Sequence, residues 1–315
     1  MAFRIGLVGL CTSHPENWVP AMRELVKEGK VDVEVTAAWD SGETRPEGFA
    51  REFCGKLAIP HAVDKLEEML DLVDGVIVHT ADWDRHLEQA ERFVEAGKSV
   101  YLDKPVAGNM RDLNRVMDWM KQGRRVTGGS VLRYCGEILA LLDRCAESGE
   151  KIHTAYTGVG VDEFNYGIHA YAILARVFGS GIRSVRYIGS SAQKQIAVFW
   201  QDGRIGLLTV GKNRWLPFHL TAVTDSRVHQ VAVDGAKLYK GMLEKVLPWF
   251  SGACDVPPTA PESLLEPELA ALAAKRSWEE GGREVFLTDL GESSGPAYDG
   301  AQFAREYRRA RMEAE

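Results

Sequence analysis

The chain has 315 residues, of which 45% are hydrophobic and 26% are charged, and its formal net charge is −7. This composition is typical of a folded protein, the length is enough for about two domains, and the acidic balance argues against nonspecific nucleic-acid binding. The basic run REYRRAR near the C-terminus (305–311) is more typical of a solvated helix face than of a nucleic-acid patch.

Five cysteines are present, and no two of them form a C-x-x-C motif. An odd number without that motif argues against a disulfide framework or a zinc knuckle and is typical of a reducing compartment. The apolar run at the N-terminus (3–10) is too short for a membrane span and lacks a signal-peptide cleavage pattern. We therefore expect a cytoplasmic protein without a membrane segment.

The first 130 residues alternate short β-rich runs with amphipathic stretches. The pattern predicts strands at 3–10, 31–40, 74–80, 98–103 and 124–130, and helices at 15–29, 64–71, 85–97 and 109–123. Asn109 is expected to cap the last of these helices and Gly123 to end it. Strict alternation implies right-handed crossovers and a parallel sheet covered on both faces, which is a doubly wound Rossmann fold over residues 1–125.

The pattern changes after residue 125. A helix at 136–149 and a strand at 151–160 precede a helix that ends at Gly179, and β-rich runs follow at 182–191, 194–200, 204–211, 217–224 and 228–234. The run QDGR (201–204) is a tight turn of the Asp-Gly kind, so consecutive strands are expected to pair antiparallel. Helices at 237–250 and 262–280 complete an α/β domain (126–290) with a large, mostly antiparallel open sheet. The tail (291–315) begins with a Gly/Ser-rich loop at 291–300.

The turn after the first strand carries part of a dinucleotide-binding motif. G-x-G-x-x-G normally stands there, for tight turning and for close approach of the backbone to a pyrophosphate. Gly9 keeps the first position, whereas Cys11 and His14 occupy the second and third. The bulkier Cys11 is expected to push a cofactor phosphate outward or to weaken its binding, and His14 could touch the pyrophosphate or lie at the surface. An ordinary α/β turn without a ligand is the alternative.

The sequence of strand, turn and helix start still suits an anion. Ser13 and Glu16 have the spacing of a capping box, and the helix start offers free N–H groups and the positive end of a dipole. The hydroxyl groups of Thr12 and Ser13 could add donors. Gly9 and residues 11–14 are therefore the candidate phosphate-binding turn.

Two polar residues follow later strands. Asp40 ends the second strand, where a carboxylate can accept hydrogen bonds from both ribose hydroxyls and repel a 2′-phosphate, so it favours NAD over NADP; the alternative is a surface turn residue. Lys104 follows the strand at 98–103, at the carboxyl edge where open α/β sheets bind ligands, and Pro105 fixes the backbone after it. A lysine there can donate to a substrate oxygen and stabilise negative charge on it, although a lone strand-end lysine is usually only solvated.

The order of these motifs resembles the Gfo/Idh/MocA family, the relatives of glucose–fructose oxidoreductase and inositol dehydrogenase. The resemblance rests on Gly9, on Asp40 and on the segment DGVIVHTADWDRHLEQAERFVEAGKSVYLDKPVAG (74–108). The stretches GIH (167–169) and SWEEGGREVFL (277–287) match the substrate domain, so the resemblance covers nearly the whole chain. Within 74–108, the residues that correspond to the family pattern are Thr80, His86, Gly97-Lys98 and Asp103-Lys104-Pro105.

The resemblance implies a Rossmann domain followed by an α/β domain whose open sheet often builds the interface of a homo-oligomer, a dimer or a tetramer. It also implies reversible oxidation of a sugar or polyol hydroxyl by NAD(P). Carried across, Lys104 orients and polarises the substrate oxygen, and His169 takes or gives the hydroxyl proton while hydride passes to nicotinamide. The implied cofactor contacts from this part of the chain are Thr80, His86, Asp103 and Lys104.

The helix that carries His169 departs from the family pattern. Relatives often have Asp-x-Gly-x-His followed by x-x-Asp, but here Asn165 and Ala172 replace the two acids. Both residues share one helical face with His169, and an Asn oxygen could orient the imidazole without supplying charge. His169 could therefore transfer a proton, or it could be a hydrogen-bonded histidine of the core. No second ligand lies beside it at metal-binding spacing, so no metal is expected.

Other groups could serve the substrate. Asp162 is a substitute acid, although its place before the helix equally suits a cap, and Tyr166 adds a polar group. By the resemblance, Arg133 would lie near the nicotinamide or the substrate. The candidate substrate residues are Arg133, Asp162, Asn165, Tyr166 and His169.

The leading hypothesis is an NAD-dependent oxidoreductase that transfers hydride between a nicotinamide cofactor and a hydroxyl of a sugar, inositol or related polyol. The missing acids and the altered glycine turn keep two alternatives open. One is a ligand-sensing or regulatory protein with the same fold, and the other is a reductase of a different bond, such as C=N or C=C.

Overall fold

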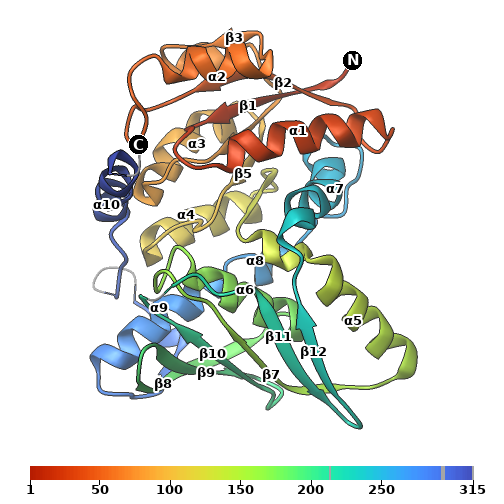
Figure 1. The fold of residues 1–315 in the computed structure, drawn as a ribbon, viewed down its shortest axis with the longest axis vertical. Coiled ribbons are helices and arrows are strands. Elements are labelled where there is room, and N and C mark those ends of the chain that lie inside the picture. The colour runs from red at the N-terminus through yellow and green to blue at the C-terminus, as the bar shows by residue number, and fades with distance from the viewer. Residues whose placement is uncertain (213, 292–294, 314–315) are drawn as a thin grey trace.

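The computed structural model describes residues 1–212, 214–291 and 295–313, and the chain folds around two β-sheets (Figure 1). The first sheet has six parallel strands in the order β3-β2-β1-β4-β5-β6. Its central strands β4 and β5 are buried along their whole length, as parallel strands covered on both faces should be. This order confirms the doubly wound Rossmann fold. The strands are β1 (Phe3–Val8), β2 (Val33–Trp39), β3 (His61–Ala62), β4 (Gly75–Val78), β5 (Ser99–Leu102) and β6 (Val126–Gly128).

The strand order reverses between β1 and β4, so the chain leaves these neighbouring strands towards opposite faces of the sheet. Such a switch point is where open α/β sheets bind ligands. The helical segments of this half are α1 (His14–Lys27), α2 (Phe49–Leu57), η1 (Leu66–Met69), η2 (Trp83–Arg85), α3 (His86–Glu95) and α4 (Met110–Lys121).

The second sheet has the order β12-β11-β7-β10-β9-β8-β13. Only the pairing of β7 with β10 is parallel among the strand pairs that the described residues form in this sheet. The expected large, mostly antiparallel sheet is therefore confirmed. The strands are β7 (Ile152–Gly158), β8 (Ile182–Ser190), β9 (Lys194–Trp200), β10 (Ile205–Val210), β11 (His219–Thr224), β12 (Val228–Ala232) and β13 (Val285–Phe286).

Helices cover one face of this sheet and leave the other open. Helix α6 (Gly167–Phe178) is apolar and buried along almost its whole length because it packs against the sheet and against α9 (Glu266–Glu279), which itself packs on β8. The strands at the open edge alternate in burial, as strands with one solvated face do. The other helical segments are η3 (Val131–Tyr134), α5 (Gly136–Ser148), η4 (Gly235–Lys237), α7 (Leu238–Phe250), α8 (Pro261–Leu264), η5 (Leu287–Asp289) and α10 (Gly300–Met312).

Helix α7 belongs to the second half of the sequence but packs on the first sheet, beside α1 (Figure 1). Phe250, its last residue, lies so close to Gly75 of β4 that a Cβ added at Gly75 would be 2.9 Å from the ring. Ser99 Oγ donates a 2.7 Å hydrogen bond to the carbonyl of Phe250. The two halves of the chain therefore share apolar core.

Several expectations need correction. The capping box at the start of α1 is wrong: Ser13 has helical backbone angles and makes no side-chain cap, and Glu16 pairs with Arg45 instead. The segment at 64–71 forms only the short 3-10 helix η1, and the helix at 262–280 is divided into α8 and α9. The expected loop at 291–300 includes residues 292–294, which lie outside the described residues. The cap at Asn109 is confirmed, because its side chain accepts from the N–H of Asp112.

No helix within the described part of the chain is both long and apolar enough to cross a membrane.

Gly9, in the turn after β1, has a backbone conformation and a close neighbour that exclude a side chain. Its φ is +79°, and an added Cβ would lie 2.5 Å from Thr80 Oγ1 and 2.8 Å from Thr80 N. We expect Gly9→Ala to lower the free energy of unfolding by about 3 kcal/mol, since left-handed backbone costs an L-residue about 1–2 kcal/mol and the clash with Thr80 adds a similar amount. Urea unfolding followed by circular dichroism measures this change.

Gly29→Ala is the matched control, because Gly29 has a φ of +71° but no atom lies within 4 Å of the position that an added Cβ would take. It should cost only the backbone term of about 1 kcal/mol. Equal losses in the two variants would contradict the close approach of Gly9 to Thr80.

Candidate functional site

The site is built where β5 ends, at the carboxyl edge of the first sheet. Lys104 follows this strand, and its Nζ donates to the side-chain oxygen of Asn165 at 2.9 Å and to the Asn165 carbonyl at 3.2 Å. The same nitrogen lies 5.4 Å from the centre of the Tyr166 ring. The lysine therefore reaches from the edge of the first sheet to the turn that precedes α6. Burial lowers the pKa of Lys104, and the charges of Asp103 and Asp162 oppose that shift.

His169 lies on α6, about one helical turn beyond Asn165. Its Nδ1 is 2.7 Å from Ser130 Oγ, and its ring contacts those of Tyr166 and Phe218. Burial holds the pKa of His169 well below its usual value, and the positive charge of Lys104 lowers it further. The imidazole is therefore neutral near pH 7 and can accept a proton. Ser130 is a contact that the sequence analysis did not foresee.

Asp162 shapes the turn that leads into α6. One of its carboxylate oxygens accepts hydrogen bonds from the N–H groups of Phe164 and Tyr166, at 2.9 and 3.0 Å. The chain is thus held in the conformation that presents Asn165 to Lys104. Burial raises the pKa of Asp162, and these N–H groups and Lys104 counteract the rise.

A group of two histidines and one carboxylate lies beside Lys104, with His79 and Asp103 buried and His14 partly buried. Asp103 Oδ2 is 2.5 Å from His14 Nδ1 and 3.2 Å from His79 Nδ1, and Asp103 Oδ1 accepts from the N–H of Lys104. Burial opposes ionisation of Asp103, but the two histidines hold its pKa well below the usual range. The potential ligand atoms of His14, His79 and Asp103 lie within 4.8 Å of one another, which is close enough to share a metal ion. The direct hydrogen bonds between these side chains already account for this spacing.

The sequence analysis missed His79 because it directly follows a buried strand and is not itself one of the pattern residues, although its neighbour Thr80 is. His14 is where the third glycine of the motif would stand, and its ring also contacts those of Trp18 and Tyr239. The paired carboxylate therefore fixes the ring of His14 at the start of α1.

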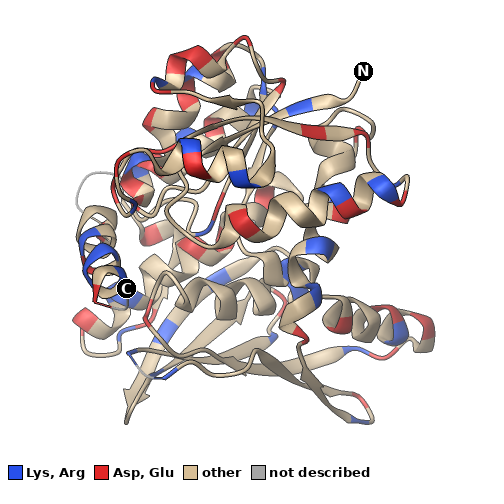
Figure 2. Cartoon of the chain, turned by 45° about the horizontal axis from the view of Figure 1, so that its top comes forward, with Lys and Arg blue, Asp and Glu red and all other residues tan. Residues whose placement is uncertain are grey.

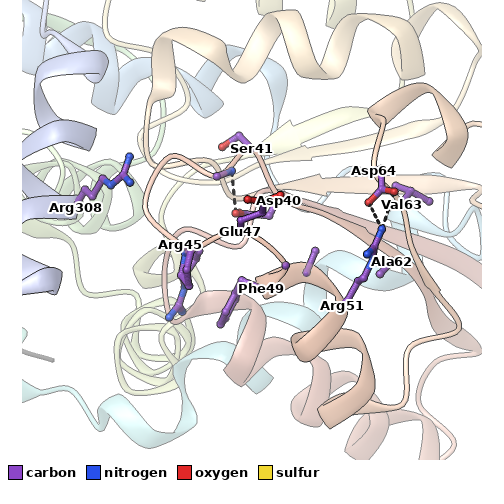
Figure 3. Close-up of a pocket in the computed structure, with 14 residues that line it drawn as sticks. Asp40, Ser41, Arg45, Glu47, Phe49, Arg51, Ala62, Val63, Asp64 and Arg308 are labelled. Atoms are coloured by element: carbon purple, nitrogen blue, oxygen red, sulfur yellow. Dashed lines mark hydrogen bonds and ion pairs between the residues drawn. The ribbon is translucent and has the colours of Figure 1, made fainter.

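Asp40 lies on the wall of a pocket of about 660 Å³ at the carboxyl ends of β2 and β3 (Figure 3). Its two oxygens accept hydrogen bonds from Leu10 N at 2.8 Å and Gly42 N at 3.0 Å. A carboxylate has about four acceptor positions, so Asp40 keeps capacity for further donors. Arg45 and, from the C-terminal helix, Arg308 also line this pocket.

The turn between β1 and α1 is covered rather than open. Cys11 is fully buried and packs in a small apolar cluster with Ala81 and Ala304 of α10. Burial raises the pKa of Cys11 to about 11. Thr12 Oγ1 accepts from the N–H of His14 at 3.2 Å, and Ser13 makes no side-chain cap.

Three candidate residues have internal partners in this structure. Thr80 Oγ1 donates to Gln89 Oε1 at 2.6 Å, and the ring of His86 lies between the carbonyls of Thr80 and Val106. The Arg133 guanidinium donates to the carbonyls of residues 263 and 264 at the start of the α8–α9 region. A ligand contact of these side chains stays a prediction, and their visible role is to fix loops around the site.

Residues 3–129 match the model of the GFO_IDH_MocA oxidoreductase family, described as having an NAD-binding Rossmann fold. The resemblance to the Gfo/Idh/MocA family is confirmed. The proposed UDP-kanosamine synthase oxidoreductase subunit of Amycolatopsis mediterranei is 31% identical over 156 residues, which cover 49% of this chain and 40% of that protein. The proposed oxidoreductase YceM of Salmonella typhimurium is 31% identical over 116 residues, which cover 36% of this chain and 34% of that protein. The chain thus aligns with less than half the length of these curated relatives.

Solved Gfo/Idh/MocA-like structures share the fold over most of the chain. Scyllo-inositol dehydrogenase from Lactobacillus casei, with NAD(H) and scyllo-inositol bound, superposes with a TM-score of 0.75 at 15% identity, covering 91% of this chain and 100% of that one. The WlbA dehydrogenase from Bordetella pertussis, in complex with NADH and UDP-GlcNAcA, gives a TM-score of 0.72 at 19% identity, covering 91% and 99%. At these identities the likeness shows the shared fold.

Proposed function

We propose that the protein is an NAD-dependent dehydrogenase that reversibly oxidises a hydroxyl of a sugar, inositol or related polyol. The observation that carries this proposal is the hydrogen bond between Lys104 and Asn165. It brings the lysine that follows β5 to the turn that precedes α6, the helix of His169. A cation and a neutral imidazole held together at the carboxyl edge of a Rossmann sheet suit oxidation of an alcohol. The match to an NAD-binding family and the inositol and UDP-sugar complexes of similar structures support the substrate class.

In the proposed reaction, Lys104 donates to the substrate oxygen and stabilises the negative charge that develops as its O–H bond breaks. His169 accepts the proton at Nε2, in the tautomer whose Nδ1–H donates to Ser130 Oγ. Bound NAD would accept the hydride from the carbon. The alcohol thereby becomes a carbonyl, and the proton and hydride leave to separate acceptors.

The cofactor residues would be those of the first turn and the second strand. The pocket beside Asp40 suits the adenosine half of a dinucleotide, and the carboxylate at its wall favours NAD over NADP. Gly9, the turn residues 11–14, Thr80, His86 and Asp103 complete the proposed cofactor set, and Arg133, Asp162, Asn165 and Tyr166 the proposed substrate set.

We further propose that the protein is a cytoplasmic homo-oligomer, a dimer or a tetramer. Tyr156, Ile205 and Val223 lie on the same face of the second sheet by strand register, and each is more than a third exposed. Contiguous exposed apolar side chains on an open sheet typically mark an interface. Covering this row by a second copy would remove it from water.

The replacement of an acid by Asn165 favours a second candidate, a ligand-sensing protein or a reductase of another bond. The neutral amide of Asn165 stands where an acidic side chain would form an ion pair with Lys104. Such a protein would keep the fold and the pocket without alcohol oxidation.

Titration of the purified protein with NADH, followed by its fluorescence, tests the cofactor part of the proposal, and NADPH is the comparison. A screen of inositols, free sugars and UDP-sugars with NAD then tests the substrate class, with NADH formation as the readout. Absence of NADH binding at millimolar concentration would end the proposal. Binding without any turnover in the screen would favour the second candidate.

A further inference from the structure

The C-terminal helix α10 lies across the first turn of the Rossmann sheet. Cys11 occupies the second glycine position of the dinucleotide motif, where the backbone closely approaches a pyrophosphate. In this structure that side chain is fully buried in one apolar cluster with Ala81 and with Ala304 of α10, and Phe303 packs on the same cluster. Helix α10 therefore lies over the turn that a dinucleotide phosphate would approach.

Two arginines of α10 extend the contact of the helix with the first turn and with the pocket beside Asp40. Arg311 Nη1 donates a 2.9 Å hydrogen bond to the carbonyl of Cys11. Arg308, one turn earlier, lies at the rim of the pocket beside Asp40 (Figure 3). Helix α10, next to the C-terminal label in Figure 2, carries several Lys or Arg positions along its length. It thus spans from the turn after β1 to the proposed adenosine pocket.

The segment just before α10 is anchored much more firmly than the helix itself. The Tyr298 ring stacks on Phe164 with centroids 4.0 Å apart, its N–H donates to the Gly108 carbonyl, and its own carbonyl accepts from Trp83 Nε1. These contacts tie Tyr298 to both domains.

Helix α10, by contrast, buries only Gly300 and Ala304. Its start is held by the N–H of Gly300, which donates to Asp84, and by the ring contact of Phe303 with Trp83. An element with so few buried apolar contacts opens at low free-energy cost compared with the core. The anchored Tyr298 and the loosely held helix meet at Asp299, the residue that caps α10.

We propose that α10 is an autoinhibitory lid, which occupies the phosphate section of the cofactor crevice and swings out about residues 298–299 before a dinucleotide binds. The proposal rests on the proposed function, since it concerns the same cofactor crevice. The apparent dissociation constant for NADH equals the intrinsic constant divided by the fraction of molecules in which the lid is open. Anything that displaces α10 therefore raises NADH affinity, and anything that locks it abolishes binding.

Ala304→Cys tests the locked state, because position 304 belongs to the same small buried cluster as the native Cys11. Oxidation at alkaline pH, which overcomes the high pKa of Cys11, should join the two residues, and mass spectrometry of the cleaved protein identifies the disulfide. We expect the oxidised variant to bind NADH at least about tenfold more weakly than the same protein after reduction. The double variant Cys11→Ser/Ala304→Cys controls for oxidation of the other cysteines and should be indifferent to reduction.

Ala304→Glu tests the released state, since a charge cannot remain in the apolar cluster without a partner. It should bind NADH at least about threefold more tightly than the wild type, by raising the open fraction. Ala310→Glu makes the same change on the exposed side of α10 and should leave affinity unchanged.

The outcomes separate the two proposals. NADH binding by the cross-linked protein as tight as by its reduced form, or wild-type affinity in Ala304→Glu, overturns the lid. If the wild type, the reduced variant and Ala304→Glu all fail to bind NADH, the dinucleotide site itself is wrong.

Discussion

Replacing Lys104 by alanine is expected to lower kcat by roughly 10²–10³-fold, the loss seen when one preorganised donor to a developing oxyanion is removed. Lys104 Nζ is held by Asn165 beside the site, and the alanine variant leaves no donor at that point. Steady-state turnover of whichever polyol or sugar the screen identifies measures the effect. Lys121→Ala, at an exposed position at the end of α4, is the matched control and should keep wild-type kcat.

The pH profile adds a second readout. Because burial lowers the pKa of Lys104, the ammonium form is lost at a lower pH than for a free lysine, and activity should fall on the alkaline side accordingly. Lys104→Arg keeps the charge to higher pH and should move that limb upward, even if its geometry lowers the rate. Turnover of Lys104→Ala within about threefold of the wild type would contradict a role in the reaction.

Replacing His169 by asparagine should lower kcat by about 10²–10⁴-fold, the usual contribution of a positioned general base. The structure supports a base because burial and the charge of Lys104 keep the pKa of His169 well below its usual value, so the ring is unprotonated at neutral pH. A base with a depressed pKa stays active as the pH falls through 6.5 and is lost only below its own pKa. The wild-type rate should therefore show no decline from His169 near pH 6.5.

Ser130→Ala separates positioning from proton transfer. It removes the Oγ partner of His169 Nδ1 while leaving the base in place, so it should cost less than His169→Asn. Unchanged kcat in His169→Asn, measured at saturating substrate, would instead identify His169 as a hydrogen-bonded core residue.

Much of the fold could be predicted from the sequence because parallel strands buried on both faces leave continuous apolar runs. β1, β4 and β5 follow this pattern, and the Asp-Gly turn indicated the hairpin between β9 and β10. The strands β3 and β13 have two residues each, which is too few to show an alternation of apolar and polar side chains. The full extent of α10 was missed because its residues are mostly polar, and its buried face consists of Gly300 and Ala304 alone.

The site could be predicted only where a side chain stands at a strand end or in a motif. Lys104 and Asp40 follow their strands, and each lies at the expected edge of the sheet. The pairing of Lys104 with Asn165 joins residues 61 positions apart, and that of Asp103 with His14 joins residues 89 apart. The first contact depends on how the two halves of the chain pack, and the second on how distant segments of the first half meet. Local periodicity encodes neither. Ser130 has no motif around it, and only its hydrogen bond with His169 in the folded structure identifies it.

The position of α7 has a consequence for how the molecule gains its stability. Phe250 and its carbonyl fill the surface of β4 and β5 near Gly75 and Ser99, so the nucleotide-binding half is completed by residues translated after most of the second sheet. A fragment ending near residue 129 would expose that apolar surface, and it should aggregate or remain partly unfolded. Calorimetry of the intact chain should accordingly show one cooperative transition, since neither half can melt without uncovering the other.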